Sequence, residues 1–120
     1  LHLGSGNTPG DLVLWLPHEK VLASGDIVVW PTPYGHGGRP RDWALTLHKI
    51  AAMDFRILVP GHGELQTGRD YLELLAASLE SVALQMKEFV AAGVSREDAV
   101  ARLDLKRTTG TLDVETEFAP

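Results

Sequence analysis

The sequence has 120 residues, of which 44% are hydrophobic and 22% are charged, proportions typical of one globular domain. Sixteen acidic residues outnumber eleven basic ones, the formal net charge is −5, and the basic residues form no stripe, which argues against nucleic acid as a partner. Without cysteine there is no disulfide, thiolate nucleophile or Cys-type zinc site. No apolar run approaches the roughly 20 residues that cross a bilayer. We expect a soluble protein, cytoplasmic rather than secreted, that binds no membrane.

Residues 11–30 predict two strands joined by a polar turn, PHEK. Leu12 to Leu16 would be apolar on both faces of the first strand, and the pattern resumes from Val21 to Ala23 until Gly25 interrupts it. Strands of this kind are usually covered on both faces, which indicates a layered α/β protein.

An irregular loop, PTPYGHGGRPR, separates these strands from a predicted helix. The helix would begin with Asp42 as its N-cap and end near Met53, because Trp43, Leu47 and Ile50 recur on one helical face. A short buried strand over 56–59 should follow.

The longest predicted helix covers residues 70–92 and is followed by a short one. Gly93 is suited to the left-handed residue after the long helix, and Ser95 with Asp98 resembles a capping box for the next. The tail from Lys106 fits either a final strand or a disordered segment. The long helix carries an apolar seam with a period near 3.5, formed by Leu72, Leu75, Leu79, Val82, Met86 and Phe89.

Three short segments contain the candidate functional residues: GSGNTPGD before a strand, ASGD after a strand, and VPGHG after another. Loops at strand ends converge on a rigid sheet, which is how layered α/β enzymes build their sites. In this order the segments resemble motifs of the metallo-β-lactamase fold superfamily of hydrolases, over roughly residues 1–70. The matching region is the second half of that family's domain.

The resemblance implies an α/β fold that is half of an αββα sandwich, with a mixed sheet and helices packed on it. It also implies zinc as cofactor, with Asp26 at the position of the aspartate that bridges two metals and His62 at the position of the last metal histidine. Gly61 and Gly63 would then let the backbone place His62 at the metal.

Two departures from the family pattern weaken this site. Asn7 stands where the family has a histidine in GHTPGD, and because an amide is a poorer zinc ligand than imidazole, Asn7 is a vestigial ligand position. The first-half motif HxHxDH is absent, since the sequence has no His-x-His and no Asp-His pair. A catalytic zinc uses three protein ligands and a water, whereas Asp26 and His62 supply two. We therefore expect no catalytic residue in this chain alone, and zinc bound weakly or not at all.

Simpler roles remain open for each residue. His62 also fits a turn histidine bonded to a carbonyl, Asp26 a turn cap, and Asn7 a local Asx turn before Thr-Pro. His36 lies in YGHGG, a loop position where the family's substrate-facing residues fall, but it equally fits a solvated side chain. Three histidines should be structural or on the surface, without partners: His2, His18 and His48.

Half of a sandwich would leave one apolar face of its sheet open. The sequence starts at Leu1 as if inside a strand, so we expect a single half-domain over 1–120, cut from something longer, with strands and site loops in 1–70, helices in 70–104 and a tail in 105–120. A missing N-terminal half or a second copy in a homodimer would cover the face.

Two classes of function follow. In the first, the chain is a fragment or truncated relative of a zinc-dependent hydrolase of ester, thioester, lactam or phosphoester bonds, with metal-bound hydroxide as nucleophile, and is not catalytically competent alone. In the second, it is a non-catalytic dimeric or partner-binding protein built on a vestigial scaffold.

Overall fold

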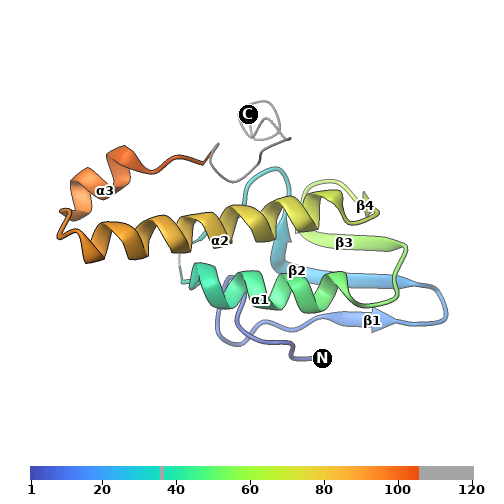
Figure 1. Ribbon diagram of the computed structural model, residues 1–120. Helices are drawn as coiled ribbons and strands as arrows, with labels where there is room; N and C mark the ends of the chain where they lie inside the picture. Colours follow the sequence, from blue (N-terminus) through green and yellow to red (C-terminus); the bar gives the residue numbers. More distant parts are fainter. Residues whose placement is uncertain (36, 106–120) are drawn as a thin grey trace.

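The computed structural model describes residues 1–35 and 37–105. They form a four-stranded sheet in the order β1-β2-β3-β4 (Figure 1). Strands β2 and β3 are parallel and the other two pairs are antiparallel, so the sheet is mixed, as expected. The strands are β1 (Leu14–Leu16), β2 (Val21–Val29), β3 (Ile57–His62) and β4 (Gln66–Thr67).

Three of the strands differ from the prediction in their boundaries. Strand β1 starts only at Leu14, and Leu12 is 66% exposed. Gly25 does not end β2, because it adopts a φ of +52°, open to glycine, and the strand continues through a shift of register against β3. Strand β3 runs to His62 instead of ending at Val59, so Asp26 and His62 both lie within strands instead of after them.

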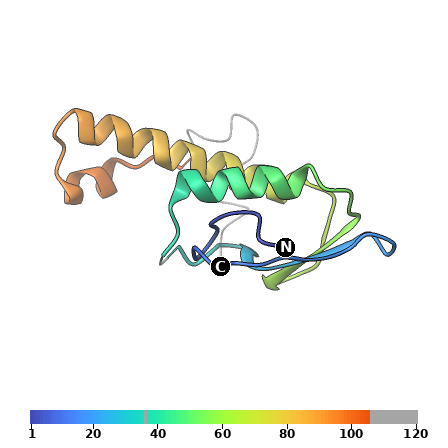
Figure 2. The same ribbon diagram turned by 90° about the horizontal axis from the view of Figure 1, so that it is seen from below.

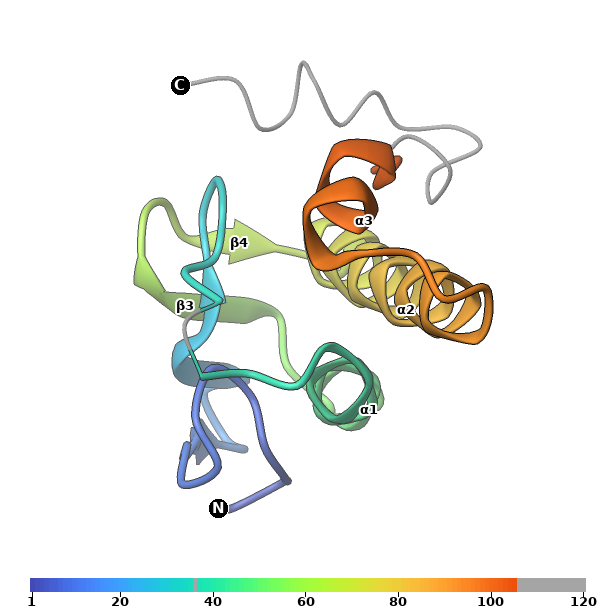
Figure 3. The same cartoon turned by 90° about the vertical axis from the view of Figure 1, so that its left-hand side faces the viewer.

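Helices α1 (Pro40–Ala51) and α2 (Asp70–Ala91) lie side by side on one face of the sheet (Figures 2 and 3). The core fills the space between them and the sheet. Trp43 of α1 is 1% exposed and its indole Nε1 donates to the Ile27 carbonyl at 2.9 Å, which ties α1 to β2. Other fully buried core residues come from the strands and both helices: Leu22, Leu47, Ile50, Leu58 and Leu75.

The helix ends follow local sequence, with one correction. Helix α1 is N-capped by Arg39 and not by Asp42, because Pro40 occupies the first helical position, where its fixed φ suits a helix start. Gly93 has a φ of +67° after α2, as predicted. Ser95 Oγ accepts a hydrogen bond from the Asp98 N–H at the start of α3 (Arg96–Arg102), which confirms this cap.

The apolar seam of α2 is buried only over its first half. Helix α2 has 22 residues against 12 in α1 and projects beyond it (Figure 1). Leu72 and Leu75 are buried, whereas Val82, Met86 and Phe89 are partly exposed. The projecting part buries Gln85 instead, whose side-chain amide bonds to both the N–H and the carbonyl of Asp104.

The described residues cover one face of the sheet and leave the other open, as half of a sandwich predicts, although the apolar strands taken alone suggested cover on both faces. Two rows of cross-strand neighbours point away from the helices, and we call their surface the open face. Leu14 and Leu16 on it are 62% and 40% exposed, and Ile57 is 36% exposed. The rows are Leu14, Ala23 and Val59, and Leu16, Val21 and Ile57.

None of the helices in residues 1–35 and 37–105 is long and apolar enough to cross a membrane. His36 and the predicted tail from Lys106 lie outside the described residues.

Candidate metal site

A bulge in β2 gives Asp26 its position. The register pairs Gly25 with Pro60 and then Val29 with His62, so three residues of β2 lie opposite one residue of β3, Gly61. Bulges of this kind re-aim side chains next to functional sites. Here Asp26 is the first residue of the bulge, and its carboxylate lies over Gly61.

The structure brings Asp26 and His62 together. Asp26 Oδ1 lies 3.4 Å from His62 Nε2, and both side chains reach solvent, with exposed fractions of 44% and 62%. Gly61 is required for this approach, because a Cβ on it would lie 2.1 Å from Asp26 Oδ1. Gly63 has a φ of +89° and leaves no room for a Cβ beside the Trp30 carbonyl, 2.5 Å away. The two glycines thus make room for the pair, one on each side of His62.

Trp30 and Tyr71 fix the end of β3 behind this pair. The Trp30 N–H donates to the His62 carbonyl at 3.0 Å. The Tyr71 hydroxyl donates to the carbonyls of Val29 and Pro31, and its ring packs edge-on against Trp30 at 4.8 Å. Burial raises the pKa of Tyr71 above its ordinary value, so the hydroxyl stays a neutral donor.

Sequence reasoning missed Tyr34. Its ring lies edge-on to the His62 imidazole, with centroids 6.3 Å apart, and it is 61% exposed. Tyr34 belongs to the loop PTPYGHGG, and its place in that loop was the one signal in the sequence that pointed to it.

Asn7 does not form the expected Asx turn through its side-chain oxygen. Asn7 Oδ1 is buried and has no hydrogen-bond partner among the described residues. The loop is held by Asp11 instead, whose carboxylate accepts from both the N–H and the hydroxyl of Thr8. Neighbouring Gly6 packs on Ile27, since a Cβ on Gly6 would lie 2.9 Å from Ile27 Cγ1. Asn7 therefore directly follows a residue, Gly6, that contacts Ile27, the neighbour of Asp26 in the chain.

Two of the remaining histidines have partners, contrary to expectation. His2 Nδ1 lies 3.0 Å from the Asp11 carbonyl, and His48 Nε2 lies 2.8 Å from Glu80 Oε1, joining α1 to α2. Both are surface contacts, and neither involves Asp26 or His62.

The donor set falls short of a catalytic zinc site. Such a site uses three protein ligands and one open position, and across residues 1–35 and 37–105 no group of three His, Cys, Asp or Glu side chains could hold a metal. Asp26 and His62 have the right chemistry for zinc, but by themselves they do not fit a catalytic ion.

No protein-family model matches the sequence. A linear primary-alkylsulfatase from a Pseudomonas species is 30% identical over 116 residues, covering 88% of this chain and 22% of that protein. Among solved structures, VMB-1 superposes with a TM-score of 0.61 at 29% identity, covering 69% of this chain and 40% of its own. The mono-zinc form of the metallo-β-lactamase FIM-1 from Pseudomonas aeruginosa gives a TM-score of 0.63 at 20% identity, covering 70% and 39%.

These relatives and the mixed, helix-covered sheet place the chain among the metallo-β-lactamase-fold proteins. The described residues form an α/β portion of that fold, related to hydrolases that carry it. The chain spans about two fifths of the solved relatives and 22% of the alkylsulfatase.

Proposed function

We propose that this chain contributes Asp26 and His62 to the zinc site of a metallo-β-lactamase-fold hydrolase and that residues outside these 120 complete the site. The supporting observation is the 3.4 Å approach of the two side chains over a glycine that leaves room for it. A completed zinc site would lower the pKa of a bound water towards 7. Because Asp26 and His62 are two ligands where a catalytic zinc uses three, we expect the 120 residues alone to hydrolyse no substrate.

The bond hydrolysed would be an ester, thioester, lactam or phosphoester. The alkylsulfatase relative adds sulfate esters to these candidates. Asp26 and His62 would bind the metal and do not select among these bonds. Substrate specificity would therefore depend on the groups around the pair.

Titration of the metal-free chain with Zn²⁺ in a calorimeter tests the shared site. We expect one weak, saturable event that weakens by roughly tenfold or more in His62→Ala, since even partners outside the ligand shell change metal affinity 10–100-fold. His18→Ala is the matched control, because His18 is exposed in the turn between β1 and β2. Equal zinc binding by His62→Ala and the unmodified chain would contradict the proposal.

The open face supports a second candidate, a non-catalytic homodimer or partner-binding protein on a vestigial site. Six apolar side chains lie on one face with no described helix over them, and a contiguous apolar surface on a protein often marks an interaction site. In a two-fold homodimer each copy would cover the other's open face.

Light scattering coupled to size exclusion separates these candidates. A dimer with no zinc binding favours the second candidate, and a monomer at micromolar concentration contradicts the homodimer.

A further inference from the structure

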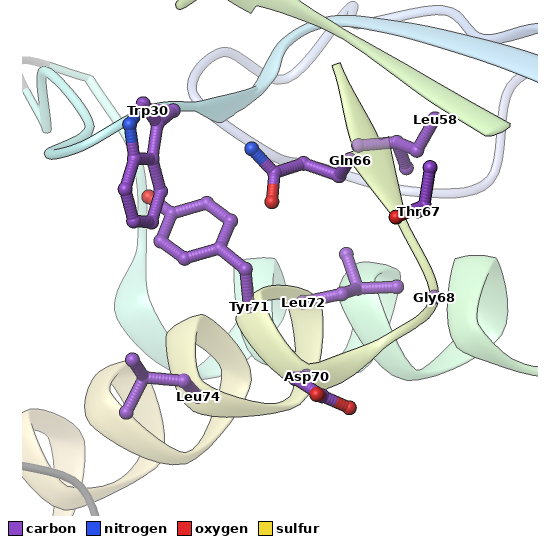
Figure 4. A pocket seen from close by; sticks show the side chains of 9 residues that line it. All are labelled: Trp30, Leu58, Gln66, Thr67, Gly68, Asp70, Tyr71, Leu72 and Leu74. Atoms are coloured by element: carbon purple, nitrogen blue, oxygen red, sulfur yellow. The ribbon is translucent and has the colours of Figure 1, made fainter. Parts of the chain in front are cut away.

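A cavity of about 300 Å³ lies between the end of the sheet and the first two turns of α2 (Figure 4). It arises because β4 has only two residues and the chain then turns directly into α2 at Gly68, whose φ is +101°. A Cβ on Gly68 would meet nothing within 4 Å, so the chain itself leaves this space open.

One wall of the cavity is aromatic. Trp30 and Tyr71 meet edge to face at an interplanar angle of 78°, and Figure 4 shows both rings together at one end of the cavity. The hydroxyl of Tyr71 donates to the carbonyls of Val29 and Pro31, so the ring offers apolar surface to the cavity. Leu58 and Leu72 extend this surface.

One polar group points into the space. In Figure 4 the Gln66 amide is directed between Trp30 and Leu72. Gln66 Nε2 donates to the Glu64 carbonyl at 3.0 Å, and Gln66 Oε1 accepts no hydrogen bond from the described residues. Gln66 Oε1 is therefore an available acceptor in a cavity that Trp30 and Tyr71 also line.

The charges around the cavity favour a neutral ligand. No lysine, arginine or histidine is among the described residues that line it, and the carboxylate of Asp70 is directed away from its centre in Figure 4. An anion would gain no partner, and a cation would be desolvated without a facing carboxylate. The volume is at the lower end of small-molecule sites, about 300–1,000 Å³, which favours one ring system over a peptide.

We propose that this cavity binds a neutral aromatic molecule that stacks on Trp30 and Tyr71 and donates a hydrogen bond to Gln66 Oε1. This site is separate from Asp26 and His62 and goes beyond the proposed function, because it needs no metal. The two sites share one element, since Trp30 lines the cavity and its N–H bonds to the His62 carbonyl.

Indole is a suitable probe because it is flat, neutral and carries one N–H donor. Titrating the nitrogen-15-labelled chain with indole should give saturable NMR shifts of the Gln66 side-chain amide and the Trp30 indole N–H. Trp15, on the far edge strand β1, should not move. No saturable shift at millimolar indole, or shifts centred on Trp15, would overturn the proposal.

Two substitutions at one position test the contact and the volume separately. Gln66→Leu keeps the size but removes the acceptor, and should weaken indole binding about five- to tenfold, the equivalent of one hydrogen bond. Gln66→Trp should fill the cavity and abolish binding. Leu65→Trp is the control, because it adds the same ring at a neighbouring position that is 61% exposed and outside the cavity lining. Binding by Gln66→Trp with unchanged affinity, or no loss in Gln66→Leu, would refute the assignment.

Discussion

At the scale of single residues, the glycines around His62 do more than form a turn. Gly61 gives the Asp26 carboxylate its place, and Gly63 lets the Trp30 backbone approach the end of β3. Both effects come from the absence of a Cβ where the ends of β2 and β3 approach each other closely. The backbone of this segment is therefore shaped around the pair of polar side chains.

Gly61→Ala should consequently disturb the pair. The added Cβ would lie 2.1 Å from Asp26 Oδ1, so Asp26 or β3 must move, and overpacking of this kind costs about 1–3 kcal/mol of unfolding free energy. Gly10→Ala is the matched control, because a Cβ there meets nothing within 4 Å. Urea denaturation measures both variants. Equal stability of Gly61→Ala and Gly10→Ala would show that the site backbone adapts freely.

Tyr71 gives a prediction for alkaline pH. Its pKa is raised by burial above the ordinary value of 10.0, so the folded state holds its proton where the unfolded state loses it. Ionisation of Tyr71 therefore leaves the free energy of unfolding unchanged below pH 10 and lowers it as the pH rises above 10. Tyr71→Phe should lose about 1 kcal/mol at neutral pH, the worth of its hydrogen bonds, but show a smaller further loss above pH 10.

Thermal denaturation between pH 7 and pH 11 checks this behaviour, with Tyr34→Phe as the control for an exposed phenol. The interpretation fails if Tyr71→Phe and the unmodified chain lose stability in parallel above pH 10.

At the scale of elements, Arg69 couples the two main helices. Its guanidinium donates to the carbonyls of Ala51 and Met53 at 2.7 and 2.6 Å, at the end of α1, while its backbone precedes α2. The same group lies over the Phe55 ring, 4.4 Å from its centroid. One cation thus satisfies carbonyls left unpaired at a helix end and holds the loop before β3.

Arg69→Lys should therefore be destabilising although it keeps the charge. An ammonium cannot reproduce the planar fork, and losing one charged hydrogen bond costs about 1.5–3 kcal/mol. Arg56→Lys is the control, because Arg56 is exposed in the neighbouring loop. The comparison is made by urea unfolding, and equal midpoints for the two variants would exclude a specific role for the Arg69 fork.

At the scale of the whole molecule, the described helices leave the open face of the sheet exposed. Helices α1 and α2 cover one face of the sheet only (Figure 3), so any contact with a second copy or with further chain should bury the other. Placing a charge at the centre of this face would oppose such a contact, because the charge would be desolvated without a partner.

Val21→Lys should accordingly shift the oligomeric state towards monomer if the homodimer forms. Val21 lies in the row between Leu16 and Ile57, whereas Leu84→Lys, on an exposed part of α2, is the control. Analytical ultracentrifugation over a concentration series measures the effect. A dimer that survives Val21→Lys unchanged would place the interface elsewhere.

The sequence by itself determined the elements whose signals are local. The period of α2, the left-handed Gly93 and the Ser95 cap depend on residues a few positions apart, and they appear where the pattern predicts them. The motifs also indicated the family's fold, because their order and spacing along the strands and loops can be read from the sequence alone.

Only the tertiary structure decided features that depend on contacts between distant segments. The bulge that aims Asp26 at His62 is a mismatch between two strands more than thirty positions apart in the chain. Tyr34 beside His62, the unbonded Asn7 oxygen and the cavity beside Trp30 likewise arise where separate loops meet. The open face has the same origin: an apolar strand pattern marks both of its faces as suited to burial, but the number of packed layers determines which face is covered.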